Sequence, residues 1–309
     1  MKVIYSRKGF DSGYGGFPSP IFPNGQIVSL PIPAKDGFFY SQLNNVYSGE
    51  SISHVVNDLT YSERNKYSRI KLSPRHKYKQ CDYTINKIEA HNDPAYYDVE
   101  HYKGYVLGQC DAAQGHLINQ KVSPGDLFVF YGLFREVEKI NDRWTYRDKT
   151  KKRHVIFGWL QIDYIAHVSS NSERKTITNK YSFVNNHPHI KKLGTFTSDI
   201  YSKNNCLYFS SGKGELTMFG RQLGVPSSGK VSKYNPKSHD LTSPHSVGVY
   251  PWEMPSFMGT NISYMKTVRS KSANLYSHRG PGQEFVMNLD GLSSTDRSSV
   301  IDHFKKIFM

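Results

Sequence analysis

Runs of apolar residues along the chain predict a series of buried strands. Lys2–Ser6 (KVIYS) opens the chain as a strand, and Gly104–Gln109, Leu127–Tyr131 and His154–Ile162 are further segments of strand length and character. We expect the last two to pair, because strands that follow one another in sequence usually lie side by side. A final strand is predicted over Gln283–Leu289.

Capping residues and helical periodicity predict helices. Asp111 is a candidate N-cap for a helix over Ala112–Asn119. A short helix is expected within Gly49–Ser68. Near the C-terminus, Ser293–Thr295 precede a segment in which apolar residues recur at helical spacing, namely Val300, Ile301, Phe304, Ile307 and Phe308.

Long segments between these elements lack a hydrophobic period. Gly9–Pro33 is broken by glycine and proline turns, yet its interspersed apolar residues predict a packed loop. Two polar segments, 169–194 and 222–246, are interpreted as loops or insertions. Strand-like segments outnumber helical ones without alternating with them, so we predict a mixed α+β fold. It is strand-rich, with a C-terminal amphipathic helix and long ordered loops, and we treat 1–309 as one large domain.

The composition indicates an anionic partner. The 309 residues include 40 Lys and Arg against 26 Asp and Glu, a formal net charge of +14. Nucleic acid, DNA above all, or a nucleotide is the favoured partner class, because basic side chains near phosphates release condensed counterions. Three cysteines without a CxxC pair, and no apolar run long enough to span a membrane, predict a cytoplasmic protein without membrane contact. The sequence indicates no protein partner.

The basic residues gather in two clusters, which we interpret as a docking surface for nucleic acid. Tyrosines interleave the first cluster and could stack on unpaired bases. A solvated surface would give the same pattern, and no zinc-finger, RNP or zipper signature accompanies it. The candidate docking residues are Arg64, Lys66, Arg69, Lys71, Arg75 and Lys77 in the first cluster, and Lys151, Lys152 and Arg153 in the second.

The first strand runs into a glycine-rich loop that is suited to an anion. Arg7 and Lys8 leave the strand, and the following glycines allow backbone N–H groups to approach a ligand. We expect Arg7 and Lys8 to bind phosphate and Ser12 to add a hydroxyl contact. The spacing matches neither the P-loop nor the dinucleotide fingerprint. A packed surface loop with an ion pair between Arg7 and Asp11 is the alternative.

The junction around residues 108–116 offers polar groups for a base or sugar. Gln109 and Gln114 carry amides, which both donate and accept hydrogen bonds and are suited to base edges. His116 would share a side of the predicted helix with Ala112 or Ala113, whose small side chains leave room for a ligand. Asp111 has the simpler role of a helix cap.

Two segments supply candidate catalytic carboxylates. His91 and Asp93 stand together in a turn, and Glu284 heads an apolar strand after a glycine-rich turn. A carboxylate in such a position can act as a general base or stabilise an oxocarbenium-like sugar cation. Glu284 could instead pair with Arg279 at a sheet edge. Glu284, Asp93 and His91 are the predicted catalytic residues.

The histidines raise the question of a metal. His187 and His189, with His91, Asp93 and His116, could supply zinc ligands, but none of their spacings matches a zinc signature. The HEXXH and deaminase arrangements are absent. We therefore predict no metal site, and the residues indicate no particular cofactor.

Segments spread over almost the whole chain resemble, in the same order, the third class of the nucleotide modification associated domains. They are Ser6–Pro33, His91–Asp98, Gly108–Leu117, Val122–Phe134, His154–Ile162 and Arg279–Val286. The family occurs in bacteria and phages and is linked to DNA base hypermodification by genomic context. The resemblance brings no established catalytic residues. It matches the recurrent polar positions Arg7, Asp11, His91, Asp93, Gln109, Gln114, His116 and Glu284, whereas Cys110–Asp111 depart from the small residues expected there.

Taken together, the residues and the resemblance favour an enzyme acting on a nucleobase or nucleotide, in DNA or as a precursor. An arginine near the first strand and a glutamate heading a late strand also match the layout of ADP-ribosyltransferases, so glycosyl- or ADP-ribosyl-type transfer is the expected chemistry. The main alternative is a non-catalytic reader of modified bases or a protein that binds a nucleotide ligand. A metal-dependent hydrolase is a third hypothesis, which requires stoichiometric metal.

Overall fold

The predicted mixed α+β fold is confirmed by a computed structural model of the chain. The structure describes residues 1–34, 38–43, 45–47, 49–62, 67–72, 79–81, 85–191, 204–259, 261–269, 273–278 and 284–309. None of the helices in these ranges combines the length and apolar character needed to cross a bilayer.

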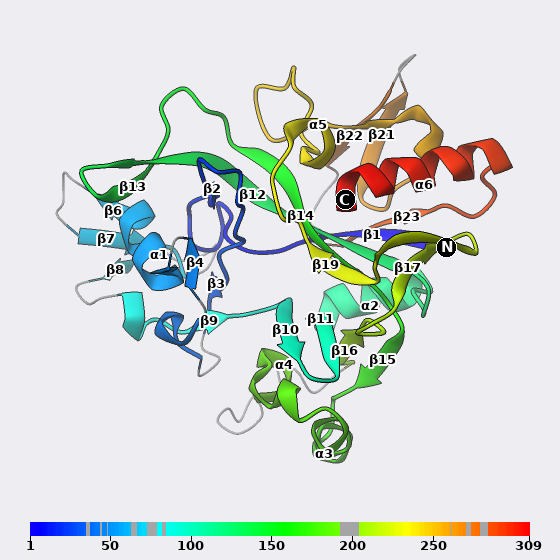
Figure 1. Ribbon diagram of the computed structural model, residues 1–309, viewed down its shortest axis with the longest axis horizontal. Helices are drawn as coiled ribbons and strands as arrows, with labels where there is room; N and C mark the ends of the chain where they lie inside the picture. Colours follow the sequence, from blue (N-terminus) through cyan, green and yellow to red (C-terminus); the bar gives the residue numbers. More distant parts are fainter. Residues whose placement is uncertain are drawn as a thin grey trace.

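A central sheet runs through the molecule in the order β19-β14-β12-β1-β23 (Figure 1). β1 (Lys2–Arg7) is parallel to β12 (Leu127–Ile140) and antiparallel to β23 (Glu284–Asn288). On the other side, β12 is antiparallel to β14 (Arg153–Gln161), which pairs with β19 (Ser228–Lys230). The predicted pairing of the two apolar strands is therefore confirmed.

The sheet is covered on both faces, which explains why its middle strands read as continuous apolar runs. One face packs against β20 (Trp252–Pro255), β21 (Met265–Arg269), β22 (Ala273–His278) and α6 (Ser294–Phe308). The other face packs against a second sheet. In that sheet, the strand order is β10 (Ala95–Val99), β11 (Tyr102–Gln109), β16 (Cys206–Phe209) and β15 (Tyr164–His167).

The predicted C-terminal helix is present as α6. The Ser293 hydroxyl accepts a hydrogen bond from the Asp296 N–H at 3.1 Å and so caps the first turn. Val300, Phe304 and Ile307 are buried against the sheet. Burying each such side chain stabilises the fold by roughly 1.5–3 kcal/mol, so packing rather than propensity holds this helix.

The expected packed loop and short helix near the N-terminus form one apolar cluster. Phe10, Phe22 and Leu30 of the loop are buried together with α1 (Ile52–Thr60), as predicted. The smaller elements of this region are β2 (Ser19–Ile21), β3 (Ile32–Pro33), η1 (Tyr40–Gln42), β4 (Asn45–Tyr47), β5 (Glu50–Ser51), β6 (Tyr61–Ser62), β7 (Tyr67–Ile70), β8 (Lys79–Cys81), η2 (Ile85–Lys87), β9 (Ala90–His91) and β13 (Arg143–Tyr146).

The cap predicted at Asp111 is wrong by one residue. α2 spans Asp111–Asn119, and Cys110 is its N-cap without a side-chain capping bond. Asp111 lies inside the first turn with a positive φ of 53°, and its N–H donates to Oδ1 of Asn204 at 2.9 Å. Asn204, from a distant segment, therefore takes the place of a local capping side chain. Spacing along the sequence does not reveal such a contact.

The loops predicted over 169–194 and 222–246 are in part regular structure. The first contains α3 (Asn171–Lys180), η3 (Ser182–Asn186) and α4 (Pro188–Lys191), and a capping box of Ser170 and Glu173 starts α3. The second contains most of β18 (Arg221–Pro226), which pairs with β17 (Glu215–Met218), then β19 and α5 (Pro236–His239). The first segment shows little hydrophobic periodicity because α3 buries only one of its sides, through Arg174 and Ile177.

Candidate active site

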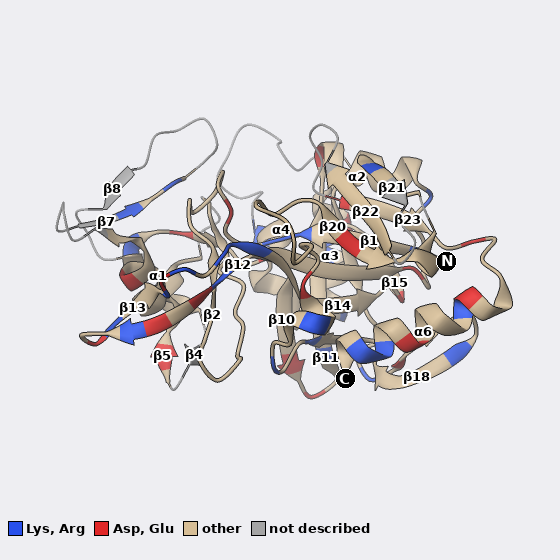
Figure 2. Cartoon of the chain, turned by 90° about the horizontal axis from the view of Figure 1, so that it is seen from above, with Lys and Arg blue, Asp and Glu red and all other residues tan. Residues whose placement is uncertain are grey.

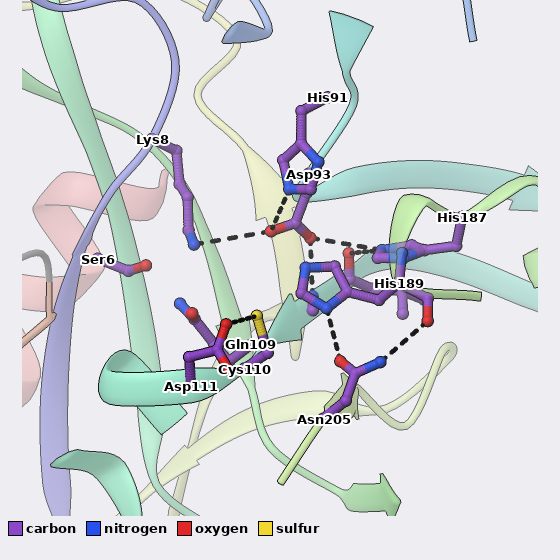
Figure 3. Close-up of polar contacts among 12 residues, drawn as sticks. Ser6, Lys8, His91, Asp93, Gln109, Cys110, Asp111, His187, His189 and Asn205 are labelled. Carbon is purple, nitrogen blue, oxygen red and sulfur yellow. Dashed lines mark hydrogen bonds and ion pairs between the residues drawn. The ribbon is translucent and has the colours of Figure 1, made fainter. Parts of the chain in front are cut away.

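Four segments that are remote in the chain end at the same place. Ser6 of β1 is opposite Glu284 of β23 in the antiparallel register. Gln109 ends β11 of the second sheet, His91 ends β9, and Asp93 lies in the turn that follows β9 (Figure 3). The side chains of Ser6 and Gln109 reach the same carboxylate oxygen, so the site lies where the two sheets meet.

Lys8 joins the two buried carboxyl groups. Its Nζ lies 3.7 Å from Oδ2 of Asp93 and 3.6 Å from Oε1 of Glu284. Figure 3 shows the ammonium directed toward Asp93 across the site. Charged groups are rarely buried unless they are paired, so the three side chains form one electrostatic unit.

Glu284 is held by only one of its two oxygens. Oε1 accepts hydrogen bonds from the Ser6 hydroxyl at 3.0 Å and from the Gln109 amide. Oε2 is buried and has no hydrogen-bond partner in the described part of the chain. Burial raises the pKa of Glu284, and Lys8, Ser6 and Gln109 offset this only in part.

Asp93 is held by both oxygens. Oδ1 accepts from the Gly108 N–H at 2.7 Å and lies 3.4 Å from Nε2 of His187, while Oδ2 lies 3.9 Å from Nε2 of His91. Burial alone would raise the pKa of Asp93. Lys8, His187 and His189 more than offset it and hold this pKa well below its usual range, so Asp93 is ionised.

His189 is fixed behind Asp93 by a buried amide. Its Nδ1 lies 2.7 Å from Oδ1 of Asn205, whose Nδ2 donates to the His189 carbonyl at 3.1 Å. Burial lowers the pKa of His189 to about 3, so the ring is neutral. The ring lies so close to Gly108 that a Cβ there would stand 2.1 Å from Cδ2 of His189. Ligand atoms of His91, Asp93 and His189 all lie within 4.8 Å of one another, and this group could hold a metal ion.

Lys8, His91, Asp93, Gln109 and His189 line a cavity of about 190 Å³, below the roughly 300–1,000 Å³ of pockets for drug-sized ligands. It has room for one ring or one phosphate group. Its polar lining consists of Arg7, Lys8, Asp11, Tyr14, His91, Asp93, Gln109, Cys110 and His189. A larger cavity of about 540 Å³ shares Gly9 and Asp93 with it and is lined further along by Tyr96 and Lys230. The rest of a larger ligand could lie there.

Some predicted site residues do not line this cavity. Glu284 is fully buried and is not among the lining residues, but it contacts two of them, Lys8 and Gln109. Oε1 of Gln114 accepts from the buried Tyr208 hydroxyl at 2.7 Å, and His116 contacts Ser263 at 3.0 Å. Neither residue lines the cavity. Ser12 is exposed, and its carbonyl accepts from Nζ of Lys71 at 2.9 Å.

Arg7 takes part in the local ion pair that was the alternative to phosphate binding. Its guanidinium lies 3.5 Å from Oδ2 of Asp11. Oδ1 of Asp11 accepts from the N–H groups of Gly13 and Tyr14 at 2.6 and 2.8 Å, so Asp11 orders the glycine-rich loop. Arg7 and Asp11 both line the cavity, and the ion pair therefore positions the arginine at its wall.

The predicted docking residues have different surroundings. Arg64, Lys66, Arg75 and Lys77 lie outside the described residues. Arg69 and Lys71 are half-buried in and after β7. Lys151 and Lys152 are exposed, whereas the Arg153 guanidinium is 3.1 Å from Asp240 and 3.7 Å from Glu136. Figure 2 shows basic and acidic segments in alternation along α6 and around β13.

Sequence reasoning missed several residues that support the site. Ser6 directly follows three buried apolar residues of β1 and gave no signal, and Asn205 comes shortly after 192–203, which lie outside the described residues. His187 and His189 were considered only as metal ligands. The signal that could have found them is the pair of histidines flanking a proline in an otherwise polar segment.

One family of known proteins matches the chain. The model of nucleotide modification associated domain 3 matches residues 2–288, which include every residue of the site. No curated protein and no solved structure matches the chain. A match over nearly the whole length shows the family and connects the chain with modification of nucleotides or DNA. The protein belongs to the nucleotide modification associated domain 3 family.

Proposed function

We propose that the protein is an enzyme that modifies a nucleobase or nucleotide, in DNA or as a precursor. Its active site would be the 190 Å³ cavity together with Glu284, which is buried against the cavity-lining residues Lys8 and Gln109. The observation that carries the proposal is the arrangement of Glu284. Three neighbours fix its Oε1, while its buried Oε2 has no partner within the described residues. Unsatisfied buried polar atoms are rare in folded proteins and call for an explanation, of which a catalytic role is one.

Glu284 has the properties of a group that exchanges a proton. Its pKa is raised by burial, and a carboxylate with a raised pKa accepts a proton more readily near neutral pH. Ser6 and Gln109 restrict its orientation, because both hold the same oxygen. The Nζ atom of Lys8 lies 3.6 Å from that same oxygen.

The transfer we propose is of the glycosyl or ADP-ribosyl type. The bond between the anomeric carbon of a nucleotide-linked sugar donor and its leaving group breaks, and the leaving group keeps the electron pair. A hydroxyl or amino group of the acceptor base forms the new bond to that carbon, and its proton passes to Glu284. An ionised Glu284 also stabilises the cationic sugar in the transition state. The position of Glu284 at the head of β23, paired with the strand that ends in Arg7, supports this form of the proposal.

The basic residues at the cavity would bind the anionic parts of the substrate. Arg7 lines the wall and is oriented by Asp11, and Lys8 stands between the two carboxyl groups. The Gln109 amide lines the same wall, where its carbonyl oxygen is suited to a base edge. Asp93 would stabilise Lys8 and positive charge on the substrate.

The test compares binding with turnover in one conservative variant. In Glu284→Gln the shape of the site is kept but the proton acceptor is removed, so turnover of an oligonucleotide or nucleotide substrate should fall by about 10²–10⁴-fold. Affinity, measured by fluorescence anisotropy, should stay within about twofold. The matched control is Glu100→Gln, which replaces an exposed glutamate remote from the cavity and should change neither quantity.

The outcome separates an enzyme from a reader of modified bases. A reader would bind its ligand equally well in both variants and produce no modified product with the wild type. Full turnover by Glu284→Gln would contradict the proposed role of this residue. Loss of affinity together with turnover would show that Glu284 binds substrate and does not exchange a proton.

A further inference from the structure

The cavity contains a second group of side chains whose chemistry the proposed function does not use. His91 ends β9, Asp93 lies in the turn that follows, and His189 belongs to α4; all three line the 190 Å³ cavity. One ligand atom from each lies within 4.8 Å of the others. The sequence predicted no metal site because the spacings match no zinc signature, but a fold can bring ligands together without such spacing.

We propose that His91, Asp93 and His189 bind one divalent transition-metal ion. Two imidazoles and one carboxylate with open positions are the ligand set of catalytic zinc sites and of non-haem iron(II) sites. The inference goes beyond the proposed function and does not depend on it, since an ion would bind here whether the protein modifies bases or reads them.

The surrounding hydrogen bonds orient two of the three ligands, His189 and Asp93, as a metal site requires. Asn205 Oδ1 can only accept, so Nδ1 of His189 donates to it and the neutral ring carries its lone pair on Nε2. Nδ1 of His187 accepts from the His189 N–H at 3.3 Å, so Nε2 of His187 carries the proton that faces Oδ1 of Asp93. Metal-binding histidines and carboxylates nearly always have such partners.

Oδ2 is the oxygen of Asp93 that remains available to bind an ion. Oδ1 is engaged by Gly108 and His187, whereas Oδ2 lies 3.9 Å from Nε2 of His91 and 3.7 Å from Nζ of Lys8. An ion would therefore replace Lys8 beside Asp93, and Lys8 would keep its contact with Glu284 at 3.6 Å.

Charge favours a further cation at this place. Two buried carboxyl groups, Asp93 and Glu284, share the single ammonium of Lys8, and the Arg7 charge is paired with Asp11. Uncompensated buried charge is costly, and a divalent ion would offset it. Arg7 and Gln109 line the same cavity, so an anionic substrate held there could supply oxygen atoms that complete the coordination.

The test measures metal content without reference to activity. A chain without a histidine tag is stripped with chelator, incubated with Zn²⁺, Fe²⁺ without oxygen, or Mg²⁺, and analysed by elemental mass spectrometry and calorimetry. We expect one Zn²⁺ or Fe²⁺ per chain and no Mg²⁺, which prefers oxygen ligands. Comparing the affinities for Zn²⁺ and Fe²⁺ then shows whether the site prefers zinc or iron.

Variants assign the ion to these side chains. His91→Asn should weaken binding at least about tenfold, a lower bound taken from the removal of second-shell partners. Lys8→Met should strengthen binding, because it removes the competing ammonium. His116→Gln, a half-buried histidine outside the cluster, is the matched control and should leave binding unchanged.

Two results would overturn the proposal. Absence of bound ion in the wild type would show that there is no site, and an unchanged affinity in His91→Asn would show that any bound ion is adventitious. If His91→Asn does not fold, the wild type can be tested with Co²⁺ as a spectroscopic probe. Co²⁺ bound at this site should give visible absorption bands, and adding Zn²⁺ should remove them by displacing the Co²⁺. Absence of such bands would contradict the proposal. Bound metal without turnover would contradict the proposed function and leave this inference standing.

Discussion

At the scale of single residues, two carboxyl groups share one lysine but have opposite properties. The hydrogen bonds and charges around Asp93 lower its pKa, while burial dominates at Glu284 and raises it. Glu284 also keeps one buried oxygen without a partner among the described residues. Asp93 therefore serves as a fixed negative charge and Glu284 as the group that can change protonation.

The stability of the wild type should report the raised pKa of Glu284. Between the ordinary glutamate pKa of 4.5 and the higher folded value, the folded state binds more protons than the unfolded state. The free energy of unfolding contributed by this group therefore falls as pH rises through that window. Glu284→Gln has no such group, so denaturant unfolding should show its stability relative to the wild type increasing with pH.

A flat difference between the two proteins across that range would contradict a raised pKa. The comparison with the variant is necessary because Asp93 acts in the opposite sense. Its pKa is lowered, so its contribution is lost as pH falls, and this contribution is present in both proteins.

At the scale of elements, the ends of strands and short helices build the site. β1, β11 and β23 deliver Lys8, Gln109 and Glu284, and the turn before α4 delivers His187. β11 and α4 are closely packed, because Gly108 of β11 lies directly against the ring of His189. The strands themselves were predictable, because both their faces are buried and their apolar runs are continuous.

Gly108→Ala should disturb this contact between β11 and α4. The new Cβ would stand 2.1 Å from Cδ2 of His189, so the imidazole must move. We expect a loss of about 1–3 kcal/mol in the free energy of unfolding, as for other overpacked cores, together with weaker activity. Chemical denaturation measures the first quantity and a turnover assay the second.

Gly115→Ala in α2 is the matched control for this prediction. The nearest atom to a Cβ there, Nδ2 of Asn204, is 3.8 Å away, an ordinary contact. Alanine is favoured over glycine inside a helix by about 1 kcal/mol, so this variant should be slightly stabilised. Equal effects of the two substitutions would contradict the close packing of His189 on β11.

At the scale of the whole molecule, the sequence predicted the fold class but not how the site is assembled. The apolar strands, α6 and the packed N-terminal loop follow from residue patterns. The parallel pairing of β1 with β12 and its antiparallel pairing with β23 join segments more than 100 residues apart, and no local pattern encodes them. The placement of Asn205, His187 and His189 depends on that assembly, as does the separation of Gln114 and His116 from the cavity.

The organisation as one large domain stays a prediction.

The second basic cluster divides by environment, and this predicts two different effects on DNA binding. Lys151 and Lys152 are exposed, so replacing both by Ala should weaken affinity and reduce the salt dependence of log K by up to about 2. Arg153 is paired with Asp240 and Glu136, so Arg153→Ala should lower stability and leave the salt dependence unchanged. Anisotropy titrations at several salt concentrations, with Lys175→Ala as an exposed control on α3, measure these effects. Identical salt slopes for all variants would contradict a docking role for Lys151 and Lys152.

The central claim is that the cavity lined by Lys8 and Asp93, with Glu284 buried beside Lys8, is where the protein modifies a nucleobase or nucleotide. Mass spectrometry of nucleosides, from DNA and the nucleotide pool of cells producing either the wild type or Glu284→Gln at equal levels, tests it most directly. The account predicts a nucleoside of altered mass with the wild type and its loss with the variant. Identical nucleoside profiles in the two samples would contradict it.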